Sequence, residues 1–579
     1  MFRRLIPVTF VALLSSGAFV ASAAGPHPRS ANGPCPPTEV AESTPPPPDD
    51  VNDDLESRCD IDPAAYYLNY ESPEYDDMAT TSASPTAMPH PAAPTTAASG
   101  RDEAAAEMVV EPPQPPPFEP GPLDDNTFVD EGDSTWVDTE RDRESTFALD
   151  VDTGSFSVAQ QFLAEGYLPE PDSIRPEEWI NSFAYGDEPA TGEALSIAVD
   201  ATTGGPDGTA LVRLGITTAN LDPVERPSAN ITFVIDTSGS MDIRERLGMV
   251  QASLALLVKN LRPDDTIAVV TYGDEATPVL APTPVEEWRD IVDAINELTP
   301  SGSTNMEAGL MLGYEQAREN FDSDDINVVV LASDGVANNG VTDPEVLTEQ
   351  ITQSGEEGIH LVTVGYGMGN YNDYLMERLA DQGDGFYSYI DTFEEAERLF
   401  VEELTPTLYV VAEQAKVQVV FDPDVVEEYR LIGYENRMLD DEEFTDDTVD
   451  AGELGAGHQV SALYEVELAD GADVDDAAGE VSLRWQEPGT DNVTEIDQDI
   501  TLGDDDASDS VRMAALVAYT AEVLKGNSVI ADRDVTLDDL LDEAEELEDD
   551  DVEGADVMVE FIEDALDAAP PYPTVETED

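Results

Sequence analysis

A short apolar strand that ends in a loop of oxygen-bearing side chains constrains the fold of this chain more than any other feature. Residues Ile231 to Ile235 form a continuous apolar run, which predicts a central strand buried on both faces. The run ends in Asp-Thr-Ser-Gly-Ser at 236–240. A helix is predicted next, because apolar residues recur at helical spacing at Leu247, Val250, Leu254, Leu257 and Leu261.

Strand and helix then alternate along the chain. Apolar runs and helical spacings predict further elements at 266–272, 285–298, 306–320, 327–332, 344–353, 359–364 and 371–380. This alternation indicates an α/β fold with a doubly wound, mostly parallel, Rossmann-like sheet that has helices on both faces. Ligands of such sheets bind at the carboxyl ends of the strands, so the loops at that edge are the candidate functional site.

Three of these loops carry side chains suited to a small, hard cation. Asp236, Ser238 and Ser240 alternate along the tight turn after the first strand, and the intervening glycine lets the backbone turn without a clash. Thr304 and Asp334 lie in two further loops at the same edge. Mg²⁺ prefers about six oxygen ligands and usually keeps waters or an external ligand, and Mn²⁺ or Ca²⁺ are the alternatives. Because only the two aspartates are charged, the metal would stay electrophilic enough to take a carboxylate from another molecule.

Each loop also has an ordinary structural interpretation. Residues 236–239 could form a turn that caps the next helix, Thr304 with Glu307 matches a capping box, and Asp334-Gly335 is a common turn dipeptide. Taken singly, these interpretations are favoured for Thr304 and Asp334. The set as a whole favours a metal site, because all three segments fall at one edge of the sheet.

The five side chains resemble the metal-ion-dependent adhesion site of von Willebrand factor type A (VWA) domains. That family has Asp-x-Ser-x-Ser, then a threonine in a Gly-x-Thr type loop, then an aspartate before glycine, and this sequence matches at Asp236, Ser238, Ser240, Thr304 and Asp334. The resemblance extends over residues 127–567, notably 145–156, 175–183 and 429–437, to exported bacterial VWA proteins that have a C-terminal domain of unknown function. It implies a non-enzymatic protein that binds a divalent cation and uses it for adhesion to a protein partner. A structural or envelope-assembly protein, in which the metal is mainly structural, is the alternative.

Apolar and polar residues alternate outside the α/β region, which predicts β-strands before it at 195–199 and 211–216, and after it at 416–421, 460–468 and 481–485. We therefore expect one β-sandwich into which the VWA domain is inserted, with a small helical C-terminal region. The predicted organisation is a signal peptide at 1–23, a disordered Pro-rich acidic linker at 24–122, an N-terminal family segment at 123–194, strands at 195–228, the VWA domain at 229–405, a β-rich domain at 406–503 and an acidic helical region at 504–579.

The amino terminus has the pattern of a secretory signal peptide. Arg3 and Arg4 precede an apolar run at 5–20, and the small residues at 21–23 form a cleavage site. A membrane anchor is the alternative, but the run is shorter than the roughly 20 residues that a spanning helix needs. We expect an exported protein in the periplasm, at the cell surface or outside the cell, with no transmembrane segment in the mature chain. An oxidising compartment would permit a disulfide between Cys35 and Cys59.

The charge excludes one class of partner. The chain has 127 acidic and 25 basic residues, a net charge of −102, so nucleic acid would be repelled. Only three lysines occur, at 259, 416 and 525. This combination of acid excess and few lysines resembles that of proteins from salty habitats, where salt screens the self-repulsion. An acidic secreted protein without adaptation to salt is the alternative.

Two features of the sequence bear on whether the chain is an enzyme. Asp152-Thr153-Gly154 looks like the loop of an aspartic protease, but that mechanism needs two such carboxylates sharing a proton, and the other similar sequence lies inside the α/β alternation. Four histidines occur, of which His458 is interpreted as structural. Since no phosphate-binding glycine loop and no zinc-ligand spacing is present in the sequence, we predict a protein that is not an enzyme.

Overall fold

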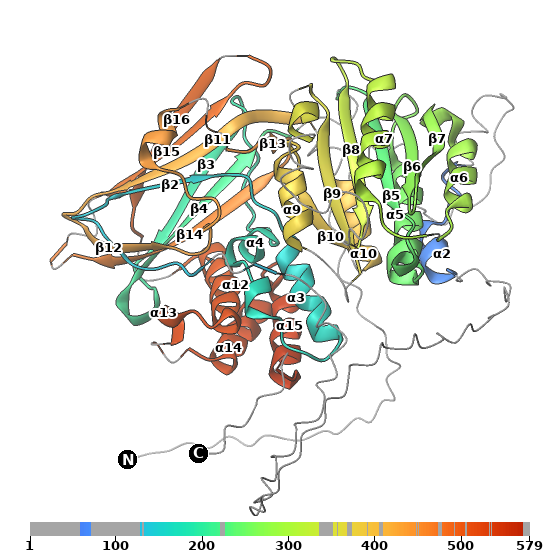
Figure 1. Ribbon diagram of the computed structural model, residues 1–579. Coiled ribbons are helices and arrows are strands. Elements are labelled where there is room, and N and C mark those ends of the chain that lie inside the picture. The colour runs from blue at the N-terminus through green and yellow to red at the C-terminus, as the bar shows by residue number, and fades with distance from the viewer. Residues whose placement is uncertain are drawn as a thin grey trace, which may run out of the picture.

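The structure of the chain, a computed structural model, describes residues 58–70 and most of 128–570 (Figure 1). Within the second range it leaves out 130–131, 221–225, 301, 335–350, 356, 368–372, 391, 404–408, 447–448, 450, 470, 473–476, 491, 504–506, 532 and 534. The predicted signal peptide at 1–23 and most of the predicted linker at 24–122 lie outside the described residues. These two predictions therefore stay predictions.

The α/β region contains a six-stranded sheet in the order β10-β9-β8-β5-β6-β7. Neighbouring strands are parallel except for the antiparallel pair β6/β7 at one edge. The strands are β5 (Ala229–Asp236), β6 (Thr266–Tyr272), β7 (Ala276–Pro284), β8 (Ile326–Ser333), β9 (His360–Tyr366) and β10 (Tyr387–Ile390). The predicted doubly wound, mostly parallel sheet is confirmed.

Helices cover both faces of this sheet because its central strands are apolar on both faces. In β5, Ile231 and Phe233 belong to the core that includes α5 and α6, whereas Val234 belongs to the core that includes α7 and α9. This is the alternation of a strand buried on both sides. The helices are α5 (Met249–Asn260), α6 (Trp288–Glu297), α7 (Met306–Glu319), α9 (Asp373–Asp381) and α10 (Phe393–Glu397).

The edge strand β7 was not predicted. It contains Pro278, Pro282 and Pro284, which interrupt any apolar run and cannot donate a ladder hydrogen bond. Prolines are tolerated at the edge of a sheet, because one side of an edge strand needs no partner. The helix predicted at 344–353 lies largely outside the described residues.

The strands on either side of the α/β region form a β-sandwich. One sheet has the order β1-β12-β14-β4-β3, and the other has the order β13-β11-β15-β16 with β2 also paired to β11. Strand β4, before the α/β region, pairs with β14, after it, so the α/β region is inserted into the sandwich as predicted. The strands are β1 (Val137–Asp138), β2 (Glu144–Ala148), β3 (Leu195–Thr202), β4 (Ala210–Thr218), β11 (Val410–Phe421), β12 (Val426–Leu431), β13 (Leu454–Gly455), β14 (Gln459–Leu468), β15 (Ala477–Gln486) and β16 (Val493–Thr501).

A helical layer lies under the sandwich in Figure 1. It combines C-terminal helices with helices from the N-terminal family segment, and one core joins them to Leu211 and Leu463 of the sandwich. The predicted C-terminal helical region is thus docked on the rest of the protein. The helices are α3 (Gly154–Ala164), α4 (Pro176–Asn181), α12 (Asp509–Lys525), α13 (Ser528–Ala531), α14 (Leu537–Asp549) and α15 (Ala555–Asp567). None of the helices in the described ranges combines the length and apolarity of a membrane span.

One part of the predicted linker differs from the expectation of disorder. Residues 58–70 include the helix α2 (Pro63–Leu68), which packs against α5 (Figure 1). Tyr66, Tyr67 and Tyr70 contact the core on that face of the sheet. Partial burial of three aromatic rings supplies the apolar contact that the rest of the linker composition lacks, and this favours a helix here. Cys59, which precedes α2 in the same described segment, is disulfide-bonded, and Cys35 lies outside the described residues.

Candidate metal site at the edge of the parallel sheet

Two neighbouring strands end at the predicted ligands. Strand β5 ends at Asp236, and the parallel strand β8 ends at Ser333, one residue before Asp334. The carboxyl ends of the two strands therefore place both aspartates at one edge of the sheet. Each aspartate is 0% exposed. Burial of two acidic side chains at the same edge is costly unless a cation or hydrogen-bond donors face them.

The third predicted loop lies against the first. The carbonyl of Gly302 accepts a hydrogen bond from the amide of Gly239 at 3.3 Å, and Gly302 has a φ of +78°, which favours glycine. Thr304 is buried in this loop. The side chain of Asn305 caps α7 by accepting from the amide of Ala308 at 3.2 Å. The capping interpretation of Thr304 is therefore wrong, because the neighbouring asparagine is the N-cap.

Hydrogen bonds bring the side-chain oxygen atoms of the first loop together. The amide of Ser238 donates to Asp236 Oδ1 at 2.7 Å, and the hydroxyls of Ser238 and Ser240 lie 3.0 Å apart. The hydroxyl of Ser333 donates to Asp236 Oδ2 at 3.1 Å. Asp236 is thus held from both strands. The carboxylate and two hydroxyls of the first loop gather within one turn, as the alternating spacing predicted.

The electrostatics of the site favour an added cation. Burial raises the pKa of Asp236 to about 7, and the charge of Asp334 adds to the rise. Asp334 Oδ1 is buried and makes no hydrogen bond to any described residue. A buried carboxylate oxygen without a donor is rare in folded proteins and points to an ion or water. Two carboxylates and nearby hydroxyl oxygens fit a hard divalent cation, which takes oxygen ligands.

The sequence reasoning missed a basic residue at this site. Arg246 Nη1 lies 2.7 Å from Asp334 Oδ2 and donates to the carbonyl of Ser240 at 2.9 Å. This arginine comes from the π-helical turn Arg244–Gly248, directly after the first loop. Only 25 of the 579 residues are basic. Because basic residues are so rare, an arginine six positions after the motif could have indicated a positive charge near the ligands.

Three family profiles match the chain in succession. The profile described as von Willebrand factor matches residues 122–206, von Willebrand factor type A domain matches 230–402, and uncharacterized protein YfbK, C-terminal, matches 406–566. The uncharacterized protein YfbK of Escherichia coli (strain K12) is 40% identical over 333 residues, which are 56% of this chain and 58% of that protein. The chain thus contains a VWA domain followed by a YfbK-type C-terminal region, and it is similar to this bacterial protein.

More distant relatives match over smaller regions. Inter-alpha-trypsin inhibitor heavy chain H2 of Mus musculus is 29% identical over 210 residues, 33% of this chain and 21% of that protein. The match thus spans less than two thirds of the length of either curated relative. A solved von Willebrand factor type A protein from Catenulispora acidiphila covers 65% of this chain and 91% of its own, at 17% identity and a TM-score of 0.37. The VWA profile at 230–402 encloses all five predicted ligands.

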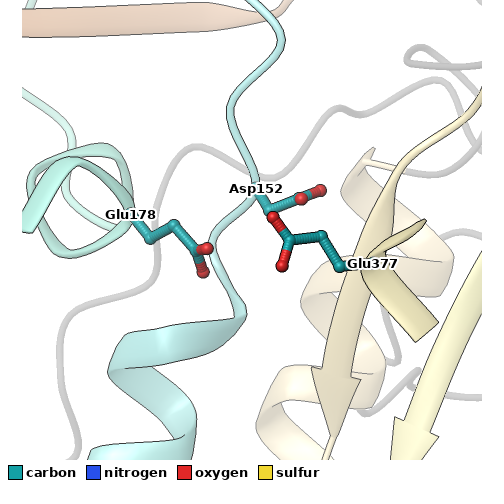
Figure 2. Close-up of side chains that lie close together, drawn as sticks. All are labelled: Asp152, Glu178 and Glu377. Atoms are coloured by element: carbon teal, nitrogen blue, oxygen red, sulfur yellow. The ribbon is translucent and has the colours of Figure 1, made fainter. Parts of the chain in front are cut away.

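A second group of buried carboxylates lies where the VWA domain meets the other parts of the chain (Figure 2). Asp152 comes from the N-terminal family segment, Glu178 from α4 and Glu377 from α9 of the VWA domain, and each has a carboxylate oxygen within 4.8 Å of the others. Two arginines form ion pairs with the group. Arg175 Nη2 lies 2.7 Å from Glu377 Oε2, and Arg437 Nη2 lies 3.1 Å from Asp152 Oδ2.

These contacts explain the protease-like sequence at Asp152. The carboxylate of Asp152 accepts a hydrogen bond from the amide of Tyr387 in β10 at 2.9 Å, in addition to its ion pair with Arg437. It therefore joins the N-terminal family segment to the VWA sheet. Asp236, the other aspartate in a similar sequence, is held by Ser238 and Ser333 instead, so the two do not form a shared-proton pair.

Proposed function

We propose that the VWA domain binds a divalent cation, Mg²⁺ first and Mn²⁺ or Ca²⁺ as alternatives, and uses it to bind a protein partner. Asp236, Ser238, Ser240, Thr304 and Asp334 would hold the ion. The observation that carries this proposal is the pair of buried aspartates at the ends of β5 and β8, with Asp334 Oδ1 lacking a donor among the described residues. A bound cation would satisfy that oxygen.

The ligand chemistry leads from metal binding to partner binding. Three of the five side chains offer neutral hydroxyl oxygens, so the two aspartates offset only part of the charge of the ion and of nearby Arg246. The ion then keeps affinity for one more anionic oxygen, as Mg²⁺ sites commonly do. We infer that an Asp or Glu carboxylate of the partner supplies it, and that the protein acts as a binding protein and not as an enzyme.

Long-range repulsion restricts which partners can bind. With a net charge of −102, the chain repels acidic proteins at low ionic strength, whereas contact coordination of a carboxylate is short-range. Capture of a carboxylate partner should therefore strengthen as salt rises from low to moderate. A basic-patch interaction would show the opposite salt dependence.

Export is part of the proposal. The signal-peptide pattern at 1–23 supports it, and the disulfide-bonded state of Cys59 supports an oxidising compartment. We place the protein in the periplasm, at the cell surface or outside the cell. Amino-terminal sequencing of the protein recovered from the cell envelope tests this, since a chain that keeps residues 1–23 would contradict cleavage.

A metal-dependent capture experiment tests the binding function. Immobilised mature protein is incubated with envelope extract in Mg²⁺, with and without EDTA, and bound proteins are identified. Thr304→Ala should lower capture, because it removes a ligand without removing the cap of α7. Ser303→Ala is the matched control, since Ser303 lies in the same loop as Thr304 but its hydroxyl donates to Asp274 Oδ1 at 2.6 Å.

The second candidate function is structural. It rests on the buried carboxylate and arginine group that joins the N-terminal family segment, the VWA domain and the segment that contains Arg437. In this case the metal would mainly stabilise the protein, and the protein would serve envelope assembly. Capture that survives both EDTA and Thr304→Ala would favour this role over adhesion.

A further inference from the structure

The α2 segment packs against α5 and against the Arg244–Gly248 turn that follows the first ligand loop, although it precedes the VWA domain by about 160 residues of chain. Figure 1 shows α2 against the lower end of α5. Ile61 and the tyrosines of this segment pack on the core of that face, and Lys259 of α5 donates to the carbonyl of Ile61 at 3.2 Å. Arg58 is buried as well. Residues 58–70 are therefore an integral part of the VWA surface, and we refer to them as the strap.

The strap contacts the chain on both sides of Arg246. The hydroxyl of Tyr70 donates to Asp242 Oδ1 at 3.1 Å, and the guanidinium carbon of Arg244 lies 4.7 Å from the centroid of the Tyr67 ring. On the other side, the Tyr70 ring lies against Gly248, where an added Cβ would approach it to 3.0 Å. The strap thus braces the turn that carries Arg246.

Arg246 in turn faces the ligands. Its guanidinium pairs with Asp334 and donates to the carbonyl of Ser240, and its side chain is only 7% exposed. A divalent cation coordinated by Asp334 would lie beside this fixed positive charge. Like charges at close range in a buried site repel strongly, so the guanidinium must shift or the ion binds less tightly.

We propose that the strap regulates the metal site: by bracing the Arg244–Gly248 turn, it holds Arg246 against Asp334 and so lowers the affinity of the site for a divalent cation. This inference rests on the proposed function of the same site. When the strap is released, the turn is free to move and Arg246 can leave Asp334 at lower cost. The strap and the cation are then coupled through one arginine.

The coupling predicts the behaviour of two kinds of variant. Tyr67→Ala with Tyr70→Ala removes the contacts to Asp242, Arg244 and Gly248, and Arg246→Met removes the charge while keeping the length of the side chain. Each should raise the affinity for Mn²⁺ by about five- to tenfold, the low end of typical coupling between sites. Because both act through Arg246, the combined variant should bind no tighter than Arg246→Met alone.

The experiment is a titration of the full mature chain with Mn²⁺, followed by electron paramagnetic resonance of the free ion. Asn69→Ala is the matched control in the strap, because its exposed side chain donates to the carbonyl of Ala65 in the same helix at 2.9 Å. Circular dichroism verifies that each variant is folded. Asp236→Ala shows whether the bound ion is the one at the site.

The possible results distinguish failure of the strap proposal from failure of the proposed function. Tighter binding in the Tyr67/Tyr70 variant that vanishes in the Arg246→Met background supports the strap. Binding that Asp236→Ala abolishes, yet that neither the strap variant nor Arg246→Met strengthens, overturns the strap and leaves the proposed function intact. If no chain binds Mn²⁺, both proposals fail.

Discussion

Replacement of Arg437 by methionine should destabilise the junction between the VWA domain and its neighbours more than the loss of an exposed ion pair would. Arg437 lies 3.1 Å from Asp152, 3.5 Å from Glu377 and Asp381, and 3.7 Å from Asp150. Its side chain is 11% exposed. Removal of one partner from a buried ion pair costs about 3–5 kcal/mol, because the remaining charge stays buried.

The loss of stability caused by Arg437→Met should depend on pH. Burial raises the pKa of Asp381 to about 7, with the charge of Arg437 opposing the rise, and burial raises the pKa of Asp152 well above its usual range. An acid with a raised folded-state pKa stabilises the fold at low pH and loses that contribution as pH rises through the folded pKa. Without Arg437 these pKa values rise further. The destabilisation should therefore be larger at pH 8 than at pH 5.5, where the acids take up protons in both proteins.

Urea denaturation in molar KCl, followed by circular dichroism at both pH values, measures this effect. Hydrogen exchange of the Tyr387 amide, which donates to Asp152, reports on the junction itself. Arg318→Met is the control, because its pair with Glu357 at 2.7 Å is 42% and 46% exposed and should contribute below about 1 kcal/mol. Equal losses of stability in the two variants, or a loss from Arg437→Met that does not change with pH, would show that Arg437 does not stabilise the junction through these buried carboxylates.

Two further predictions concern the charge of the whole chain and the start of strand β5. Molar KCl should raise the melting temperature strongly, since it screens the self-repulsion of 127 acidic residues, and a melting temperature that is unchanged by salt contradicts the halophilic interpretation. Asp265→Asn should lower the free energy of unfolding by about 3–5 kcal/mol, because fully buried Asp265 pairs with Arg226 and accepts the amide of Ala229 at 2.8 Å. A denaturation midpoint within error of the wild type would show that this buried pair adds nothing.

The sheet and three of its loops could be predicted because their signals are local. A strand buried on both faces reads as an apolar run, and the ligand loop follows it directly at Asp236. The insertion of the VWA domain into the sandwich was also predicted, because the spacing of apolar residues changes from helical to alternating on either side of the domain. The edge strand β7 was missed because its prolines mimic a loop.

Other parts of the site depend on contacts that sequence order does not show. Arg246 and Asp334 are 88 positions apart, and their pairing follows from how α5 packs on the sheet. The strap sits in a Pro-rich acidic region whose average composition predicts disorder, although the closely spaced Tyr66, Tyr67 and Tyr70 were a local sign of order. The average composition of a long segment does not reveal a short helix within it that packs on the folded domain.

Calorimetric titration of the mature protein with Mn²⁺ measures directly whether the VWA domain binds a divalent cation. We expect a single bound ion per chain, lost in Asp236→Ala, and a gain in stability of about 2.7 kcal/mol when free Mn²⁺ reaches a hundred times the dissociation constant. Asp274→Ala is the control, because Asp274 lies on the neighbouring loop and bonds Ser303. A wild-type chain that binds no ion, or an Asp236→Ala chain that binds as tightly as the wild type, would contradict the assignment of the metal site.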